Sequence, residues 1–203
     1  VRPVLENYDD LNDWFARVLS QIGRTPDLIV GNSFSSSMLY HALRTGRVPA
    51  AAKVIMACPT PDTTHLANML QRLSNKFPEK PGWYIYNSRL IQNIRVVVAL
   101  KAHRQEARQW LRESELYKKD YLTLRDSDVL TTLLYEHNPF VEGVSSDDQR
   151  RVAVILGGKD NVITSKTPDI IHQLLPESQV INVSAAGHIL QFEAVEAYPD
   201  IDF

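Results

Sequence analysis

The sequence has 203 residues, of which 44% are hydrophobic and 23% charged, and a formal net charge of -2. These values are typical of one globular domain with a sizeable core and argue against disorder. The Lys and Arg residues are dispersed along the chain, which excludes a basic surface for nucleic acid or an anionic membrane and favours a small-molecule or protein partner. No apolar stretch is long enough to span a bilayer, so we expect a soluble protein.

The first predicted element is an amphipathic helix from Asp10 to Ile22. Its apolar residues recur at helical spacing, Asp9 or Asp10 is expected to cap its start, and Gly23 follows where a C-cap residue belongs. The run Leu28-Ile29-Val30 comes next and is short and uniformly apolar. It predicts a strand buried on both faces of a parallel sheet.

A serine in a tight turn follows this strand directly. In the run Gly31-Asn32-Ser33-Phe34-Ser35, small residues stand two positions before and two positions after Ser33, although Ser35 replaces the commoner glycine. Small residues let the strand and the following helix approach closely, so the turn predicts a serine presented as a nucleophile. The alternative is that Ser33 is a turn residue or a helix N-cap.

The next elements are a helix over 36–43 and a second buried strand over 53–57. Cys58, the single cysteine, ends that apolar run, so we expect it to be buried and to indicate a cytoplasmic location. Residues 59–149 do not continue this alternation of strands and helices. Apolar residues recur at helical spacing over 66–73, 90–98 and 130–134 without a clear strand, and 104–120 is dense in charged residues. This pattern predicts a helical lid with solvated faces.

Strands are predicted again over 151–156 and 179–183, with a helix over 168–175 between them. Strands alternating with helices favour an α/β fold with a mostly parallel sheet flanked by helices. We therefore predict a core formed by 1–58 and 150–203, interrupted by a lid at 59–149.

Three polar residues follow strands of this predicted sheet, namely Ser33, Asp160 and His188. The carboxyl ends of parallel strands meet at one edge, so these side chains are expected to lie together. A neutral serine needs a base to take its proton and an acid to orient that base, and these are the required residue types. The alternatives are that Asp160 is a turn former and that His188 is a loop or core histidine. Glu193 is expected to be a solvated or helix-capping carboxylate.

Three segments carry a family resemblance: Leu28 to Ser35, Leu156 to Ile163, and Ala186 to Glu193. In these segments, and in the chain order Ser, Asp, His, the sequence resembles the α/β-hydrolase superfamily, specifically its members with a helical lid. The resemblance implies a serine hydrolase that cleaves an ester, thioester or amide bond of a small acyl substrate through an acyl-enzyme on Ser33. Asp160 would then orient His188, and the backbone N–H of Phe34 would donate to the oxyanion.

The sequence indicates no cofactor and no metal. It has no phosphate loop or dinucleotide fingerprint, and the other histidines lack metal-ligand spacing. We therefore expect chemistry that depends on side chains and backbone amides alone.

The resemblance also predicts strands and an oxyanion loop before the nucleophile, but the first helix of this chain matches the helix just before the nucleophile strand. We therefore expect an N-terminally incomplete sheet, with the edge beside Leu28 to Val30 covered by a missing N-terminal segment or a partner chain. Two alternatives follow. One is a non-catalytic binding or interaction module with this fold, and the other is a superfamily member with C–C hydrolase, lyase or acyltransferase activity.

Overall fold

The computed structural model describes residues 6–63, 88, 90, 93, 94, 96, 100, 101, 105–121, 123–198 and 201. The periodicity predicted over 66–73, and most of that over 90–98, lies outside the described residues. In chain order the elements are α1 (Tyr8–Ile22), β1 (Leu28–Asn32), α2 (Phe34–Arg44), β2 (Lys53–Ala57), α6 (Gln105–Tyr121), α7 (Leu124–Tyr135), α8 (Ser146–Gln149), β3 (Val152–Gly157), α9 (Thr167–Leu174), β4 (Gln179–Val183), α10 (Leu190–Glu193) and the short helix η1 (Val195–Ala197).

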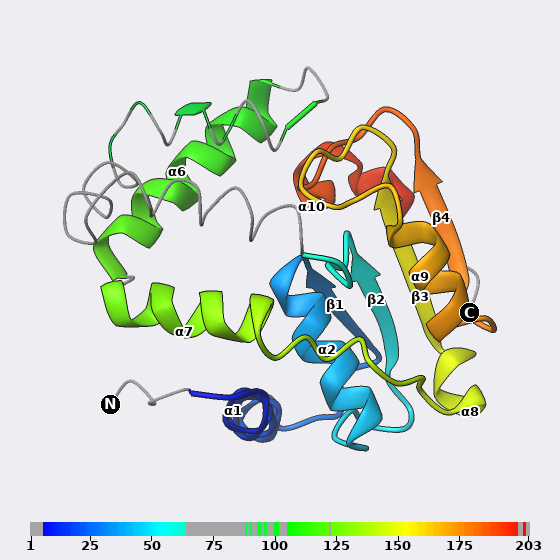
Figure 1. Cartoon of the computed structure of the whole chain (residues 1–203). Helices are drawn as coiled ribbons and strands as arrows, with labels where there is room; N and C mark the ends of the chain where they lie inside the picture. Colours follow the sequence, from blue (N-terminus) through cyan, green and yellow to red (C-terminus); the bar gives the residue numbers. More distant parts are fainter. Residues whose placement is uncertain are drawn as a thin grey trace.

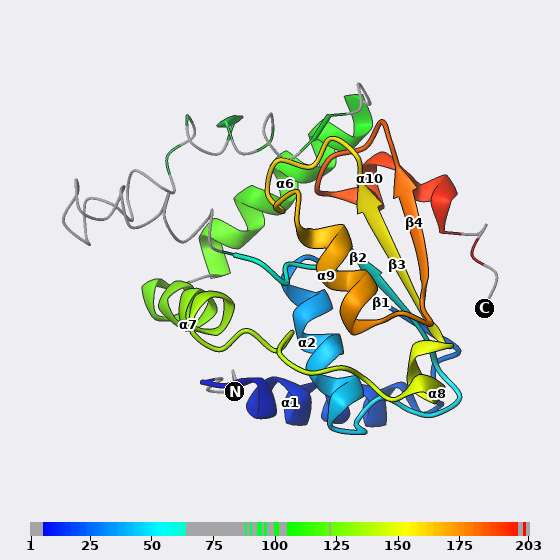
Figure 2. The ribbon, with the colours of Figure 1, turned by 45° about the vertical axis from the view of Figure 1, so that its right-hand side comes forward.

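The four strands form one parallel sheet in the order β1-β2-β3-β4. Gly31 pairs with Met56, and Leu156 pairs with Asn182. This arrangement confirms the predicted α/β fold with a parallel sheet flanked by helices. All four strands point towards the same end of the molecule, where α10 and α6 lie (Figures 1 and 2).

The core lies on both faces of the sheet because the apolar side chains of β2 and β3 alternate between them. On one face, Val54 and Val154 pack in a cluster with residues of α2 and α9. On the other face, Ile55 and Ile155 pack with Leu190 of α10. Both central strands are therefore covered on each side.

Strand β1 differs from its prediction. It was expected to be buried on both faces, but Leu28 and Val30 are 45% and 47% exposed. The reason is its position, because β1 pairs only with β2 among the described strands and forms an edge of the sheet. A uniformly apolar run does not reveal whether a strand is central or at the edge.

The start of α1 also differs from its prediction. Asn7 is the N-cap, and its side-chain oxygen accepts a hydrogen bond of 2.9 Å from the backbone N–H of Asp10. Asp9 and Asp10 instead lie in the first turn, where a negative charge interacts favourably with the helix dipole.

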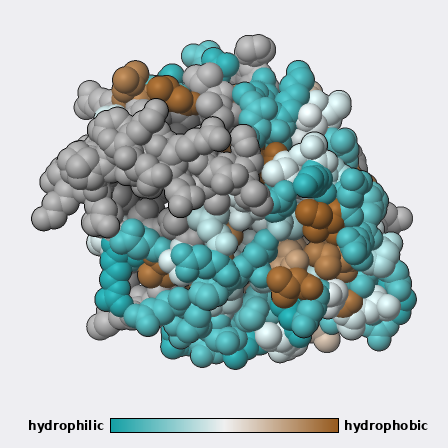
Figure 3. All heavy atoms as spheres, in the orientation of Figure 1, coloured by the Kyte–Doolittle hydropathy of each residue, from teal (hydrophilic) through white to brown (hydrophobic). Residues whose placement is uncertain are grey.

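The described part of 59–149 contributes helices. α6 packs against α10, while α7 packs near α1 and α2 through a cluster that contains Tyr8, Leu133 and Phe34. None of the described helices has the length and apolar character needed to cross a membrane. The face shown in Figure 3 is mostly hydrophilic over the described residues.

Candidate active site

Ser33 stands at the turn between β1 and α2, with φ 55 and ψ -119. A positive φ is rare for a residue with a Cβ and marks a strained turn. The backbone N–H of Ser33 donates to the carbonyl of Ala57 at 2.9 Å, which ties the turn to the end of β2. The turn therefore holds the serine at the carboxyl edge of the sheet, as predicted for a nucleophile elbow.

Gly31 explains why this turn needs a small residue before the serine. A Cβ at Gly31 would lie 2.8 Å from Leu39 Cδ1 and 2.8 Å from the backbone of Ser35, which is closer than real Cβ atoms approach. Ser35 itself is exposed, so its side chain has room. The requirement for glycine thus applies to position 31, while serine is tolerated at position 35.

A second serine, Ser36, supports the turn through hydrogen bonds. The buried Ser36 hydroxyl lies 2.9 Å from the carbonyl of Gly31 and 3.1 Å from that of Ala57. It can donate its proton to either carbonyl, so it links the elbow to β2. From the sequence, Ser36 was predicted only as part of the helix over 36–43.

Asp160 follows β3 and lies in a loop that organises its carboxylate. Its Oδ1 accepts hydrogen bonds from the backbone N–H groups of Val162, at 2.7 Å, and Ile163, at 3.2 Å. Burial alone would raise the pKa of Asp160, but the hydrogen bond and charge of His188, with the amide of Val162, hold that pKa below its ordinary value. The carboxylate is therefore ionised at neutral pH.

His188 follows β4 and joins the other two residues. Its Nδ1 lies 2.7 Å from Asp160 Oδ2, and its Nε2 lies 2.8 Å from Ser33 Oγ. The imidazole is 6% exposed and the Asp160 side chain is fully buried. The structure thus brings the three predicted residues into one hydrogen-bonded chain. With the proton on Nδ1 donated to Asp160, Nε2 is free to accept the proton of Ser33.

Cys58 is buried, as predicted, but it also lies beside this chain. Its thiol is 3.7 Å from the carbonyl of Gly187, and its sulfur is within 4.8 Å of ligand atoms of Asp160 and His188. Burial, reinforced by the negative charge of Asp160, raises the pKa of Cys58, so the thiol stays protonated. Within the described part of the chain, this is the one group of three that could hold a metal ion. A protonated thiol and a histidine already bonded to Asp160 fit the hydrogen-bonded chain better than a metal site.

Glu193 corrects another expectation. A solvated carboxylate was one alternative, but Glu193 is only 3% exposed. Its Oε2 accepts a hydrogen bond of 2.5 Å from the backbone N–H of Gly187, the residue before His188. The capping alternative is not supported either, because α10 has Ile189 as its N-cap with no side-chain capping hydrogen bond, and Glu193 instead binds the loop that precedes the helix.

Apolar side chains gather next to Ser33. Phe34 and Met38 of α2 pack against a cluster that includes Tyr8 and Leu133, and the rings of Tyr8 and Phe34 are stacked with centroids 6.0 Å apart. Phe34 also begins α2, so its backbone N–H belongs to the first turn, where amides lack an acceptor within the helix. An apolar surface and an amide donor thus accompany the serine.

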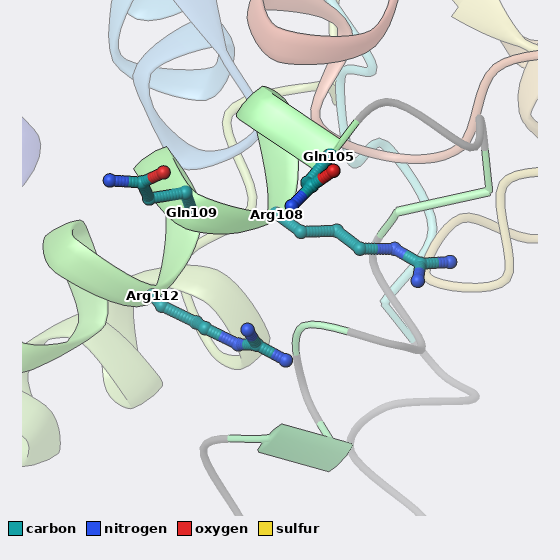
Figure 4. Close-up of a pocket in the computed structure, with 4 residues that line it drawn as sticks. All are labelled: Gln105, Arg108, Gln109 and Arg112. Carbon is teal, nitrogen blue, oxygen red and sulfur yellow. The ribbon is translucent and has the colours of Figure 1, made fainter.

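The surface also has a hollow of about 530 Å³ that is separate from this site. Its lining residues Gln105, Arg108, Gln109 and Arg112 all belong to α6 (Figure 4). Neither Ser33 nor His188 lines it.

The sequence matches no family model and no curated protein. Solved structures do match the fold. A 2-hydroxy-6-oxo-6-phenylhexa-2,4-dienoate hydrolase from Rhodococcus sp. strain RHA1 has a TM-score of 0.67 and 12% identity, over 98% of this chain and 72% of that chain. A hydrolase from Oleispira antarctica has a TM-score of 0.67 and 15% identity, over 94% and 68%. An esterase from Exiguobacterium antarcticum has a TM-score of 0.65 and 13% identity, over 97% and 72%.

These similarities agree with the parallel sheet flanked by helices, and a further match with a TM-score of 0.60 and 12% identity, over 97% of this chain and 72% of that chain, is an alpha/beta hydrolase fold protein from Burkholderia ambifaria. The chain has the α/β-hydrolase fold.

Proposed function

We propose that this protein is a serine hydrolase that cleaves an ester, thioester or amide bond of a small acyl substrate through an acyl-enzyme on Ser33. The observation that carries the proposal is the hydrogen-bonded chain from Ser33 through His188 to Asp160, with distances of 2.8 Å and 2.7 Å. This arrangement is the one that acyl transfer requires, and a role for these residues in turns or packing alone does not explain it.

In the proposed mechanism, Ser33 Oγ attacks the carbonyl carbon while His188 Nε2 takes its proton. Asp160 keeps His188 in the required tautomer and stabilises the imidazolium that forms. His188 then gives the proton to the leaving group, and the acyl group remains on Ser33. In the second half, His188 takes a proton from water, the resulting hydroxide attacks the acyl carbon, and the acid is released as Ser33 recovers its proton.

The developing oxyanion would receive a hydrogen bond from the backbone N–H of Phe34, because that amide opens α2 directly after the nucleophile. A second donor normally shares this task, and losing one donor costs on the order of a hundredfold to a thousandfold in rate. The exposed edge of β1 adjoins the nucleophile turn, so we infer that an additional segment or a partner chain covers this edge and supplies the second donor.

The acyl group is proposed to be hydrophobic, because Phe34, Met38 and Val129 lie in the apolar cluster next to the nucleophile. The chemistry needs no cofactor. We propose the cytoplasm as the compartment, since the single cysteine is a buried free thiol.

Hydrolysis of a series of p-nitrophenyl esters, from acetate to octanoate, tests this function. We expect kcat/KM to rise with chain length and Ser33→Ala to reduce it by about a thousandfold or more. No hydrolysis of any ester by the folded protein would favour the non-catalytic alternative.

Two of the similar structures are named as a 2-hydroxy-6-oxo-6-phenylhexa-2,4-dienoate hydrolase and a meta-cleavage product hydrolase. A substrate with a scissile C–C bond therefore belongs in the same panel.

A further inference from the structure

Glu193 is a buried carboxylate with both oxygens engaged by backbone amides. Oε2 accepts from Gly187 at 2.5 Å, and Oε1 accepts from Lys101 in a short hydrogen bond. A carboxylate that is 3% exposed would be costly to bury without such donors. Hydrogen bonds to an ionised acceptor are about twice as strong as neutral ones. The two amides therefore fix the position of the Glu193 carboxylate, and the carboxylate fixes the two backbone segments that carry the amides.

The two amides belong to distant parts of the chain. Gly187 immediately precedes His188, whereas Lys101 lies in the insert, shortly before α6. One side chain therefore joins the loop of the proposed general base to the insert.

Apolar packing follows the same connection. Ile189 and Phe192, on either side of Leu190, pack against a cluster formed by Val96, Leu100, Ala107 and Leu111. The rings of Phe192 and Trp110 are stacked with centroids 6.5 Å apart, and Leu190 itself is buried in the core under the sheet. The short helix α10 thus contacts the insert on one side and the core on the other, directly after His188.

We propose that Glu193 is a positioning residue that couples the docking of the insert to the orientation of His188; this inference rests on the proposed hydrolase function. When Lys101 is docked, its amide fixes the carboxylate, and the carboxylate in turn fixes Gly187. The imidazole then stays aligned between Ser33 and Asp160, with the Cys58 sulfur within 4.8 Å of the ligand atoms of Asp160 and His188. Without the Lys101 donor, Glu193 keeps one of its two hydrogen bonds and holds the histidine loop less firmly.

Glu193→Gln tests this coupling because Gln is neutral and has one acceptor oxygen, so one backbone N–H loses its acceptor and the other loses the negative charge of its acceptor. Glu196→Gln, an exposed carboxylate in η1, is the matched control. Amide hydrogen exchange measured by mass spectrometry should show exchange about tenfold faster in E193Q at both Gly187 and Lys101, since a hydrogen bond to a charged group contributes at least that factor. Labelling by a fluorophosphonate should show kinact reduced about tenfold with KI unchanged, because Glu193 does not touch the substrate. E196Q should match the wild type in both assays.

Faster exchange at Gly187 with unchanged exchange at Lys101 would overturn the coupling to the insert, and an unchanged kinact would overturn the positioning of His188. If E193Q does not fold, Lys101→Pro removes the N–H that Lys101 donates and leaves Glu193 in place; Gly187 should then exchange faster, and unchanged exchange at Gly187 would overturn the proposal. The exchange measurement needs no catalysis. An absence of labelling in the wild type would therefore reject the hydrolase function, while the exchange data would still decide the coupling.

Discussion

The backbone of Gly157, at the end of β3, lies close to the loop that carries His188. A Cβ built at Gly157 would lie 2.0 Å from the carbonyl oxygen of Gly187 and 2.9 Å from that of Ala186. Ordinary van der Waals contact begins at 3.4 Å, so Gly157→Ala would push the loop away by about 1.4 Å. His188 directly follows Gly187 in this loop. If the displacement of Gly187 were transmitted to His188, its Nε2 would leave hydrogen-bond range of Ser33 Oγ.

Misplacing a catalytic group by about 1 Å can cost about a hundredfold in rate, so we expect G157A to react with a fluorophosphonate about a hundredfold more slowly than the wild type. Gly143→Ala is the matched control, because its Cβ would meet only the carbonyl of Leu174 at 3.5 Å. The assay is the second-order labelling rate, measured below the thermal unfolding midpoint of each variant. Labelling of folded G157A within about threefold of the G143A rate would refute the reasoning.

Two further predictions concern Asp160 and Ser36, the serine that supports the nucleophile turn. Folding lowers the pKa of Asp160 below its ordinary value of 3.8, so its stabilising contribution is fully present above that pH and is lost as the pH falls towards the folded value. The free energy of unfolding of the wild type, measured in urea from pH 6 to about pH 2, should therefore fall more steeply below about pH 4 than that of Asp160→Asn; parallel curves would contradict this. Ser36→Ala should reduce the free energy of unfolding by about 1–2 kcal/mol, because it removes the hydroxyl that serves the carbonyls of Gly31 and Ala57, and an unchanged urea midpoint would count against that role.

The sequence was sufficient to predict the sheet and its edge. The apolar runs of β2 and β3 indicated their positions because central parallel strands are apolar on both faces, whereas β4 is the other edge strand among the described strands and mixes polar with apolar residues. Ser33, Asp160 and His188 were found because each follows such a run, and strand ends in a parallel sheet converge. The apolar run of β1 wrongly predicted burial on both faces, while the edge beside it was predicted from the family resemblance, since a strand's neighbours are set by tertiary pairing and not by its own residues.

Cys58 and Glu193 show what local reasoning misses. Burial of Cys58 was expected from its apolar run, but its position beside Asp160 depends on how the ends of β2 and β3 meet. Glu193 was expected to be solvated or capping because carboxylates are rarely buried. Its actual donors, Gly187 and Lys101, include one that is 92 residues away in sequence, and no local pattern indicates such a contact.

The most direct test of the proposed chemistry is to locate the covalent adduct of a fluorophosphonate by peptide mass spectrometry. The proposed mechanism predicts that the wild type carries one phosphonyl group on Ser33, with no adduct on Ser35, Ser36 or Ser37. Ser33→Ala should remain unlabelled while keeping the wild-type unfolding midpoint. Labelling of S33A at the wild-type rate, or an adduct on another residue of the wild type, would contradict the assignment of Ser33 as the nucleophile.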